Sequence, residues 1–286
     1  MVLTNWLRFN EPLEGIVHFM YQDVKGWVST GVGNKIDETA QPNSAPTAAE
    51  RAASLQLATQ LDWHDQNTQA SASADEVAAA WDAVKARLDL APQGHRAFEP
   101  LTQLRLSDGE IDRIVQQKAL EMEQTLTSRP EFGDFASWPA NAQFGTLSMS
   151  WGMGPMFRFP RFQGFVAAGQ WAAAAEECRF TPDEGTIKLR NKLDRMHFQL
   201  AQTVADRQLP VESPALGLDS VLGVQHALWM LGFDPGAQDG GDGPRTQAGV
   251  RSFQNGVGVT PNGAWNDPDT QAQLADSLTG NGWTVV

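Results

Sequence analysis

Near the N-terminus, residue types suited to hydrolytic chemistry lie close together. Glu14 is followed by Asp23 nine positions later, by Ser29 six positions beyond that, and then by Gly31 and Gly33. Cleaving a glycosidic bond requires a carboxylic acid that protonates the leaving oxygen and a carboxylate that activates or replaces a water on the other face. Glu14 and Asp23 offer that pair, and the Ser29 hydroxyl can hold a water near Asp23. The chain has 34 acidic residues, so residue types alone leave ordinary surface acids as the alternative.

These groups need elements that position them. Residues 4–21 carry apolar side chains at roughly helical spacing and predict a helix that contains Glu14. Residues 22–34 alternate and contain glycines, which predicts a short hairpin. A general acid that works near neutral pH needs a raised pKa, so we expect Glu14 to be sheltered by apolar groups such as Trp27 or Met20.

The same stretch resembles the active-site signature of phage-type lysozymes, the muramidases related to phage endolysins. The positions in step with that signature are Glu14, Gly15, Tyr21, Asp23, Gly26, Trp27, Ser29, Gly31 and Gly33. The resemblance implies that Glu14 is the general acid, that Asp23 activates water or stabilises charge, and that Ser29 stands where the family usually has Thr. Asn34 replaces the usual His, so no role for Asn34 is implied. Related lytic transglycosylases lack the second carboxylate, so Asp23 favours hydrolysis, with inversion at the anomeric carbon.

Helix-breaking residues along the chain predict two domains. Prolines and glycine near residues 206–220 interrupt the helical pattern and separate a domain of residues 1–208 from one of residues 216–286. In the first domain, helices are expected at 46–65 and 73–90, after a capping box of Ser107 and Glu110, over a buried stretch at 141–157, and in two later segments. The expected fold is α+β, mostly helical, with one small hairpin sheet. The lysozyme resemblance covers residues 1–34 and about 104–200, whereas 35–103 is a longer insertion that contains an exposed loop.

Other residues of the first domain are candidates for saccharide contacts. Trp27 can stack on a sugar face, as can Trp138, Phe157 and Phe159, although aromatic side chains in helical proteins more often lie in the core. Asn141 can bind an N-acetyl group or cap the buried helix. We retain both alternatives for Asn141.

The sequence of residues 216–286 predicts three helices joined by Gly-rich loops. Gly-x-x-Gly-Pro-x-Thr at 240–246 and Gly-x-x-x-x-Pro-x-Thr at 263–270 each place Pro where a helix begins. The blocks "VQHALWMLG", "DGGDGPRTQAGVRSFQ" and "NGAWNDPDT" resemble the peptidoglycan-binding domain found at the ends of many cell-wall hydrolases. Polarity and expected exposure nominate four ligand residues, namely Asp239, Arg245, Gln254 and Trp265. Asp239 and Asp242 are expected to make local turn hydrogen bonds rather than to bind calcium.

Composition limits the classes of partner. The formal net charge of −13 argues against sequence-independent binding of nucleic acid. No apolar run is long enough to span a bilayer, and no signal peptide is recognisable. The single cysteine, Cys178, is expected to pack in a helix, and the isolated His18 and His197 do not suggest a metal site. We therefore expect a monomer without a cofactor or a metal.

The two resemblances converge on one polymer. They imply a muramidase that cleaves the β-1,4 bond between N-acetylmuramic acid and N-acetylglucosamine and is targeted to peptidoglycan by its C-terminal domain. Delivery to the periplasm or cell wall would require another system, a holin or a contractile secretion machine, and an immunity protein is a further expected partner. The alternatives are a non-catalytic wall-binding protein on a lysozyme-like scaffold, a lytic transglycosylase, or an enzyme for a related polymer such as chitin.

Overall fold

The computed structural model describes residues 2–286, which form a mostly helical protein with three small sheets. The chain divides into two compact units, one of residues 14–117 and one that joins the residues up to 13 with residues 118–286. Helices α1 (Val2–Glu14) and α4 (Asp108–Thr127) contribute residues to both units. Short strands beside many helices confirm the predicted α+β class.

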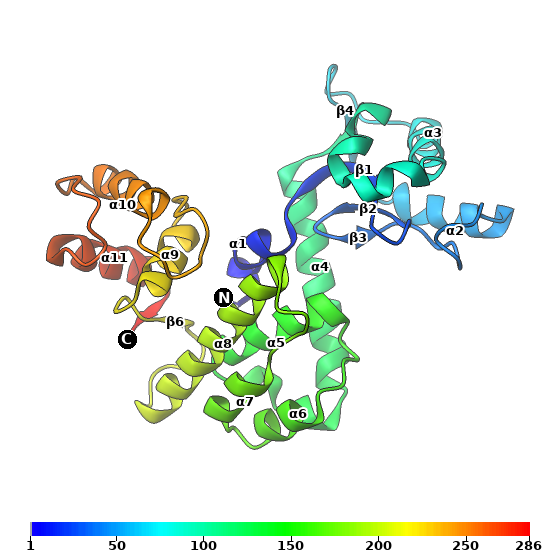
Figure 1. The fold of residues 1–286 in the computed structure, drawn as a ribbon. Helices are drawn as coiled ribbons and strands as arrows, with labels where there is room; N and C mark the ends of the chain where they lie inside the picture. Colours follow the sequence, from blue (N-terminus) through cyan, green and yellow to red (C-terminus); the bar gives the residue numbers. More distant parts are fainter. Residues whose placement is uncertain (1) are drawn as a thin grey trace. The chain divides into compact units, whose positions relative to one another are not determined.

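The unit of residues 14–117 contains the predicted hairpin. Strands β1 (Val17–Gln22), β2 (Val28–Gly31) and β3 (Asn34–Lys35) form an antiparallel sheet in that order (Figure 1). The helix predicted over residues 4–21 is too long, because α1 ends at Glu14 and Gly15 follows with φ +75°. Glycine enters this left-handed region without the strain that a Cβ would cause, so the chain can leave the helix and start β1.

The insertion at 35–103 is folded. Its elements, with the strand and helix that follow, are α2 (Ala48–Ala58), β4 (Trp63–Asp65), α3 (Ala74–Lys85), the 3₁₀ helices η1 (Leu88–Gln93) and η2 (His95–Leu101), and β5 (Leu104–Leu106) before α4. The predicted helix at 46–65 stops at Ala58, whose carbonyl accepts the Trp63 indole N–H at 2.9 Å, and residues 63–65 pair with β5 instead. The stretch at 37–47, which the sequence predicts as the exposed loop, is not exposed at its first residues, because Asp37 and Thr39 are buried.

The other unit is built around α5 (Ala140–Met153), which confirms the predicted buried helix. Helix α8 (Gly185–Asp206) packs against α5 so closely that a Cβ on Gly145 would lie 2.6 Å from Phe198 Cε2. Helices α6 (Pro160–Ala167) and α7 (Trp171–Glu177) complete this group, with the short η3 (Pro130–Phe132) and η4 (Phe135–Ser137) ahead of α5. Cys178 is buried as predicted, and burial raises the pKa of its thiol.

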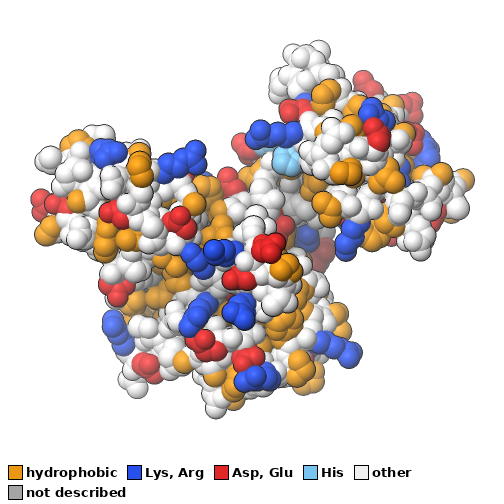
Figure 2. All heavy atoms as spheres, viewed as in Figure 1, with side chains coloured by type: hydrophobic (Ala, Val, Ile, Leu, Met, Phe, Trp, Pro, Cys, Tyr) orange, Lys and Arg blue, Asp and Glu red, His pale blue; other side chains and the backbone are white. Residues whose placement is uncertain are grey.

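The C-terminal region has the three predicted helices, α9 (Val221–Met230), α10 (Pro244–Val257) and α11 (Pro268–Gly280) (Figure 1). Strands β6 (Ala215–Leu216) and β7 (Thr284–Val285) pair in parallel and bring the start and end of this region together. Its core contains Val224, Leu228, Val250 and Phe253. On the face drawn in Figure 2, acidic and basic side chains are interspersed. Across residues 2–286, no helix has the length and apolarity to cross a membrane.

Candidate functional site

Asp23 lies in the turn of the hairpin, immediately after β1. Its Oδ1 accepts backbone N–H groups of Lys25 at 2.9 Å, Gly26 at 2.8 Å and Trp27 at 3.0 Å. An Asp side chain that accepts backbone hydrogen bonds in this way shapes the turn that follows it. Asp23 is half-buried, so one carboxylate oxygen organises the loop while the group as a whole keeps contact with solvent.

Glu14 ends α1 and lies beside the Gly-x-Gly segment. A Cβ built on Gly33 would lie 3.8 Å from Glu14 Oε2, and Gly33 has φ +67°. Only glycine takes this conformation readily, so the second glycine of the pair is required for the backbone to turn beside the carboxylate. Glu14 is exposed, so the apolar shelter that we expected for it is not found.

Tyr21 connects the two acids electrostatically. Its burial, followed by the charges of Asp23 and then Glu14, raises the pKa of Tyr21 to about 12. Both carboxylates therefore act on one phenol, although they are nine positions apart in the sequence. Both predicted acids therefore lie close enough to Tyr21 to act on it. The phenol of Tyr21 is protonated at neutral pH.

Ser29 and Trp27 belong to the same hairpin. Ser29 pairs with Tyr21 across the antiparallel ladder, so their side chains share one face of the sheet, and Ser29 is only 3% exposed. The Trp27 indole donates to the Thr39 carbonyl at 3.0 Å, which fixes a half-buried ring. Sugar stacking by Trp27 and a hydroxyl role for Ser29 stay predictions.

The other unit holds Asn141, and its contacts give it a structural role. The side chain is fully buried, accepts the Ala215 N–H at 2.6 Å, donates to the Ala215 carbonyl at 2.8 Å and lies 3.0 Å from His197 Nδ1. Asn141 does not cap α5, since the N-cap residue is Pro139 without a side-chain cap. Its hydrogen bonds to Ala215 instead connect β6 to the buried helix α5. Because the Asn141 side chain is fully buried, it is not placed to bind a saccharide.

The remaining aromatic candidates also differ in exposure. Trp138 and Phe157 are buried, which agrees with a place in the core rather than with sugar stacking. Phe159 is half-buried. None of the described residues forms a cluster of three or more acidic, His or Cys side chains that could hold a metal ion.

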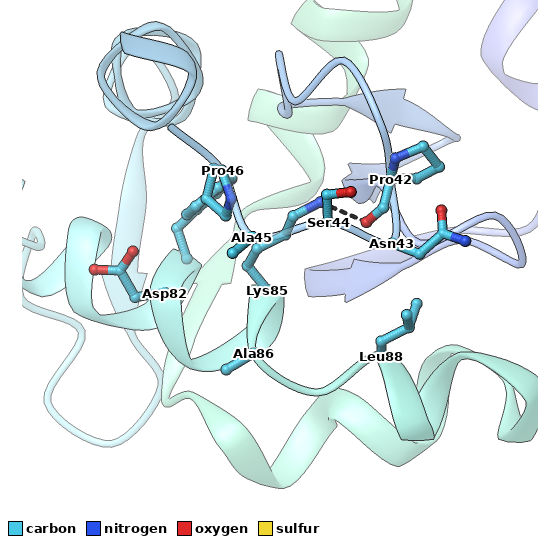
Figure 3. Close-up of a pocket in the computed structure, with 10 residues that line it drawn as sticks. Pro42, Asn43, Ser44, Ala45, Pro46, Asp82, Lys85, Ala86 and Leu88 are labelled. Carbon is cyan, nitrogen blue, oxygen red and sulfur yellow. Dashed lines mark hydrogen bonds between the residues drawn. The ribbon is translucent and has the colours of Figure 1, made fainter. Parts of the chain in front are cut away.

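A pocket of about 360 Å³ lies between the 42–46 loop and the C-terminal end of α3 (Figure 3). Lys85 reaches from α3 to the Pro42 carbonyl at 3.0 Å, and its Nζ also contacts Asp37 Oδ2 at 2.8 Å and the Gly26 carbonyl at 3.2 Å. Burial alone would raise the pKa of Asp37, but hydrogen bonds from Lys85, Thr39 and Val28 outweigh it and hold that pKa below its usual value. This buried ion pair supports the loop that carries Asp23 and was not recognised in the sequence.

The four ligand candidates of the C-terminal region fall into two groups. Asp239 and Arg245 are exposed and line an open pocket of about 600 Å³ at the start of α10. Asp239 Oδ1 accepts the Gly241 N–H at 2.8 Å, the kind of turn hydrogen bond that was expected. Trp265 is half-buried against the core, and Gln254 is fully buried.

Gln254 is one member of a repeated pair. Its amide donates to Thr270 Oγ1 at 2.7 Å and accepts the Gly263 N–H at 2.9 Å. Gln225 does the same one helix earlier, donating to Thr246 Oγ1 at 2.9 Å and accepting the Gly240 N–H at 2.8 Å. The signal was present in the sequence as "VQ" and "FQ", each ahead of a Gly-rich loop that ends in Thr.

We expect Gln254→Ala to lower the free energy of unfolding by about 1–3 kcal/mol, because it leaves buried polar partners unsatisfied. Differential scanning calorimetry would measure this change. Gln247→Ala, at a half-buried position of the same helix, is the control and should stay within about 0.5 kcal/mol of wild type. Normal stability together with lost affinity for peptidoglycan would instead identify Gln254 as a ligand residue.

Comparison with known proteins identifies the C-terminal region. Residues 218–274 match the family model of the peptidoglycan binding domain. The matched segment runs from just before α9 into α11. It therefore includes both Gly-rich loops that hydrogen-bond to Gln225 and Gln254. No curated protein and no solved structure matches the chain. The C-terminal region therefore binds peptidoglycan, which places the action of the chain at the cell wall.

Proposed function

We propose that the chain is a peptidoglycan muramidase whose reaction uses Glu14 and Asp23. The observation that supports this most is that both carboxylates act on Tyr21, since glycoside hydrolysis requires two acids close to one site. The peptidoglycan-binding region supplies the polymer, because tethering to the wall raises the local concentration of glycan around the catalytic unit.

In the proposed reaction, Glu14 gives its proton to the glycosidic oxygen as the bond to the anomeric carbon of N-acetylmuramic acid breaks. Asp23 takes a proton from a water that attacks that carbon from the opposite face. Asp23 holds the turn through Oδ1, so Oδ2 is the oxygen assigned to the water. Glu14 is exposed, and a glycan lying over it would exclude water and favour its protonated form.

The exposure of Glu14 also favours a second candidate, a wall-binding protein in which the hairpin has no catalytic role. If the protein is a muramidase, we propose that a holin or a contractile secretion machine delivers it and that an immunity protein inhibits it. The wall-binding alternative requires none of these partners.

Mass spectrometry of digested sacculi distinguishes these functions. We expect soluble fragments with reducing N-acetylmuramic acid ends, because water is the nucleophile. Anhydro-muramic ends would identify a lytic transglycosylase, and binding to sacculi without any release of fragments would leave only the wall-binding protein. Chitin digested faster than peptidoglycan would change the proposed substrate.

A further inference from the structure

The insertion packs against the strand that leads into Asp23. Both 3₁₀ helices of the insertion, η1 and η2, contact β1, and β1 ends one residue before Asp23. A segment absent from the lysozyme resemblance is therefore part of the surroundings of the candidate site, and its side chains can contact whatever binds there.

His95 is a residue of the insertion whose ring lies beside Tyr21, the neighbour that both acids share. Its ring centroid lies 6.0 Å from that of Tyr21, at 66°, and 6.3 Å from that of Phe19. Gly94 precedes it with φ +83°, a turn that starts η2 and directs His95 toward β1.

The strand geometry places His95 on the relevant face. The rings of Phe19 and Tyr21 both lie beside His95, so these two side chains share one side of β1, and Asp23 follows just past the end of the strand. Ser29 joins that side because it pairs with Tyr21. The opposite side is occupied by α3, as shown by the Gln22 amide donating to the Val84 carbonyl at 2.6 Å. His95 thus lies beside Tyr21, on the face of the sheet that also carries Ser29.

The imidazole of His95 is available for a ligand. His95 is exposed, and within residues 2–286 we find no hydrogen bond to either of its ring nitrogens. A neutral imidazole carries one N–H donor and one acceptor, which suits the hydroxyl and acetamido groups of an amino sugar. Nearby Glu14 and Asp23 would repel a carboxylate, so a neutral glycan group is a better ligand than an anionic stem peptide.

We propose that His95 is a substrate-binding residue by which the insertion extends the saccharide site around Glu14 and Asp23. The inference rests on the proposed function for the identity of the glycan. His95 binds and orients a sugar of the glycan strand through a ring N–H, and takes no part in proton transfer at the scissile bond.

Steady-state kinetics on soluble glycan-strand fragments test this role. His95→Ala should raise KM about tenfold through loss of one hydrogen bond and leave kcat within about twofold. His95→Gln keeps a donor and should recover part of the loss. The control is His64→Ala, since His64 lies on β4 of the same unit and pairs with Arg105 of β5. Unchanged KM in His95→Ala, or an equal rise in His64→Ala, would overturn the proposal.

A binding experiment separates failure of this inference from failure of the proposed function. In a Glu14→Gln background, ¹⁵N-labelled histidine signals are recorded while chitooligosaccharide or stem-peptide-bearing muropeptide is added. We expect the His95 signal to move with both ligands. Movement with the muropeptide alone would reassign His95 to the stem peptide, and no movement with either would refute the site, whether or not wild type digests sacculi. Thermal unfolding of His95→Ala should match wild type, since a lower transition would point to a packing role.

Discussion

Glu14→Gln is expected to lower the rate at which the protein clears a suspension of purified sacculi by about 10²- to 10⁴-fold. The amide has nearly the size of the carboxyl group but cannot donate a proton to the leaving oxygen. Peptidoglycan binding should persist, because it belongs to residues 218–274, far along the chain from Glu14. Turbidity measures clearing, and co-sedimentation with sacculi measures binding in the same samples.

The companion variant at Asp23 needs care, since this side chain also builds the hairpin turn. Asp23→Asn retains an oxygen that can accept the three backbone hydrogen bonds and removes the negative charge, whereas Asp23→Ala would disturb the turn as well. Glu38→Gln is the control for Glu14→Gln, because Glu38 is an exposed acid of the same unit that follows the sheet. Equal clearing by wild type, Glu14→Gln and Asp23→Asn would eliminate the proposed site.

The turn and the second strand of the hairpin are the part of the site that the sequence predicts well, whereas its first strand was predicted as helix. Local signals suffice there, because a turn with glycines between alternating residues has few other solutions. Gly26 illustrates the constraint: it has φ +103°, and a Cβ would lie 2.7 Å from Leu88 Cδ1 and 3.2 Å from the Pro42 carbonyl. The glycines of the motif therefore have backbone reasons that are independent of any resemblance.

Exposure and side-chain partners were less predictable. Apolar spacing in residues 17–21 fits a helix as well as a half-buried strand, and only Gly15 after Glu14 distinguishes them. Likewise, a polar stretch that begins with Asp37 looks solvated until Lys85, 48 positions later, is known to meet it. Pairings at this separation leave no periodic trace in a single sequence.

The C-terminal region shows the same division. Pro at the start of α10 and α11 and the Gly-rich loops between apolar segments predict the three helices. Polarity alone misplaced Gln254 among exposed ligand candidates, because a glutamine that satisfies buried backbone and hydroxyl groups has the same residue type as one that faces solvent. Only the repetition of Gln ahead of each Gly-rich loop carries the distinction.

Lys85→Met is expected to lower the free energy of unfolding of the unit of residues 14–117 by about 3–5 kcal/mol, because it leaves Asp37 charged and buried without its cation. The side chain of Asp37 is 0% exposed and that of Lys85 is 6% exposed. Methionine fills much of the space of the lysine stem, so packing against the pocket shown in Figure 3 is largely retained. Urea unfolding followed by Trp fluorescence measures the loss, and Lys25→Met, at an exposed lysine of the same hairpin, should stay within about 0.5 kcal/mol of wild type.

The stability of Lys85→Met should also depend on pH in a defined direction. A carboxyl whose pKa is lowered on folding contributes stability that is present above its unfolded pKa and is lost as pH falls through the folded pKa. Loss of the Lys85 hydrogen bond leaves burial less opposed and raises the pKa of Asp37, so the stability deficit of Lys85→Met relative to wild type should be largest near neutral pH and should shrink as the pH falls and Asp37 becomes protonated. Lys85→Met combined with Asp37→Asn removes the unpaired charge and should recover part of the lost stability. Because Lys85 also holds the Gly26 carbonyl beside the Asp23 turn, clearing of sacculi should fall in Lys85→Met and should stay low in the double variant, which does not restore this contact. A double variant no more stable than Lys85→Met would show that the buried charge is not the cause.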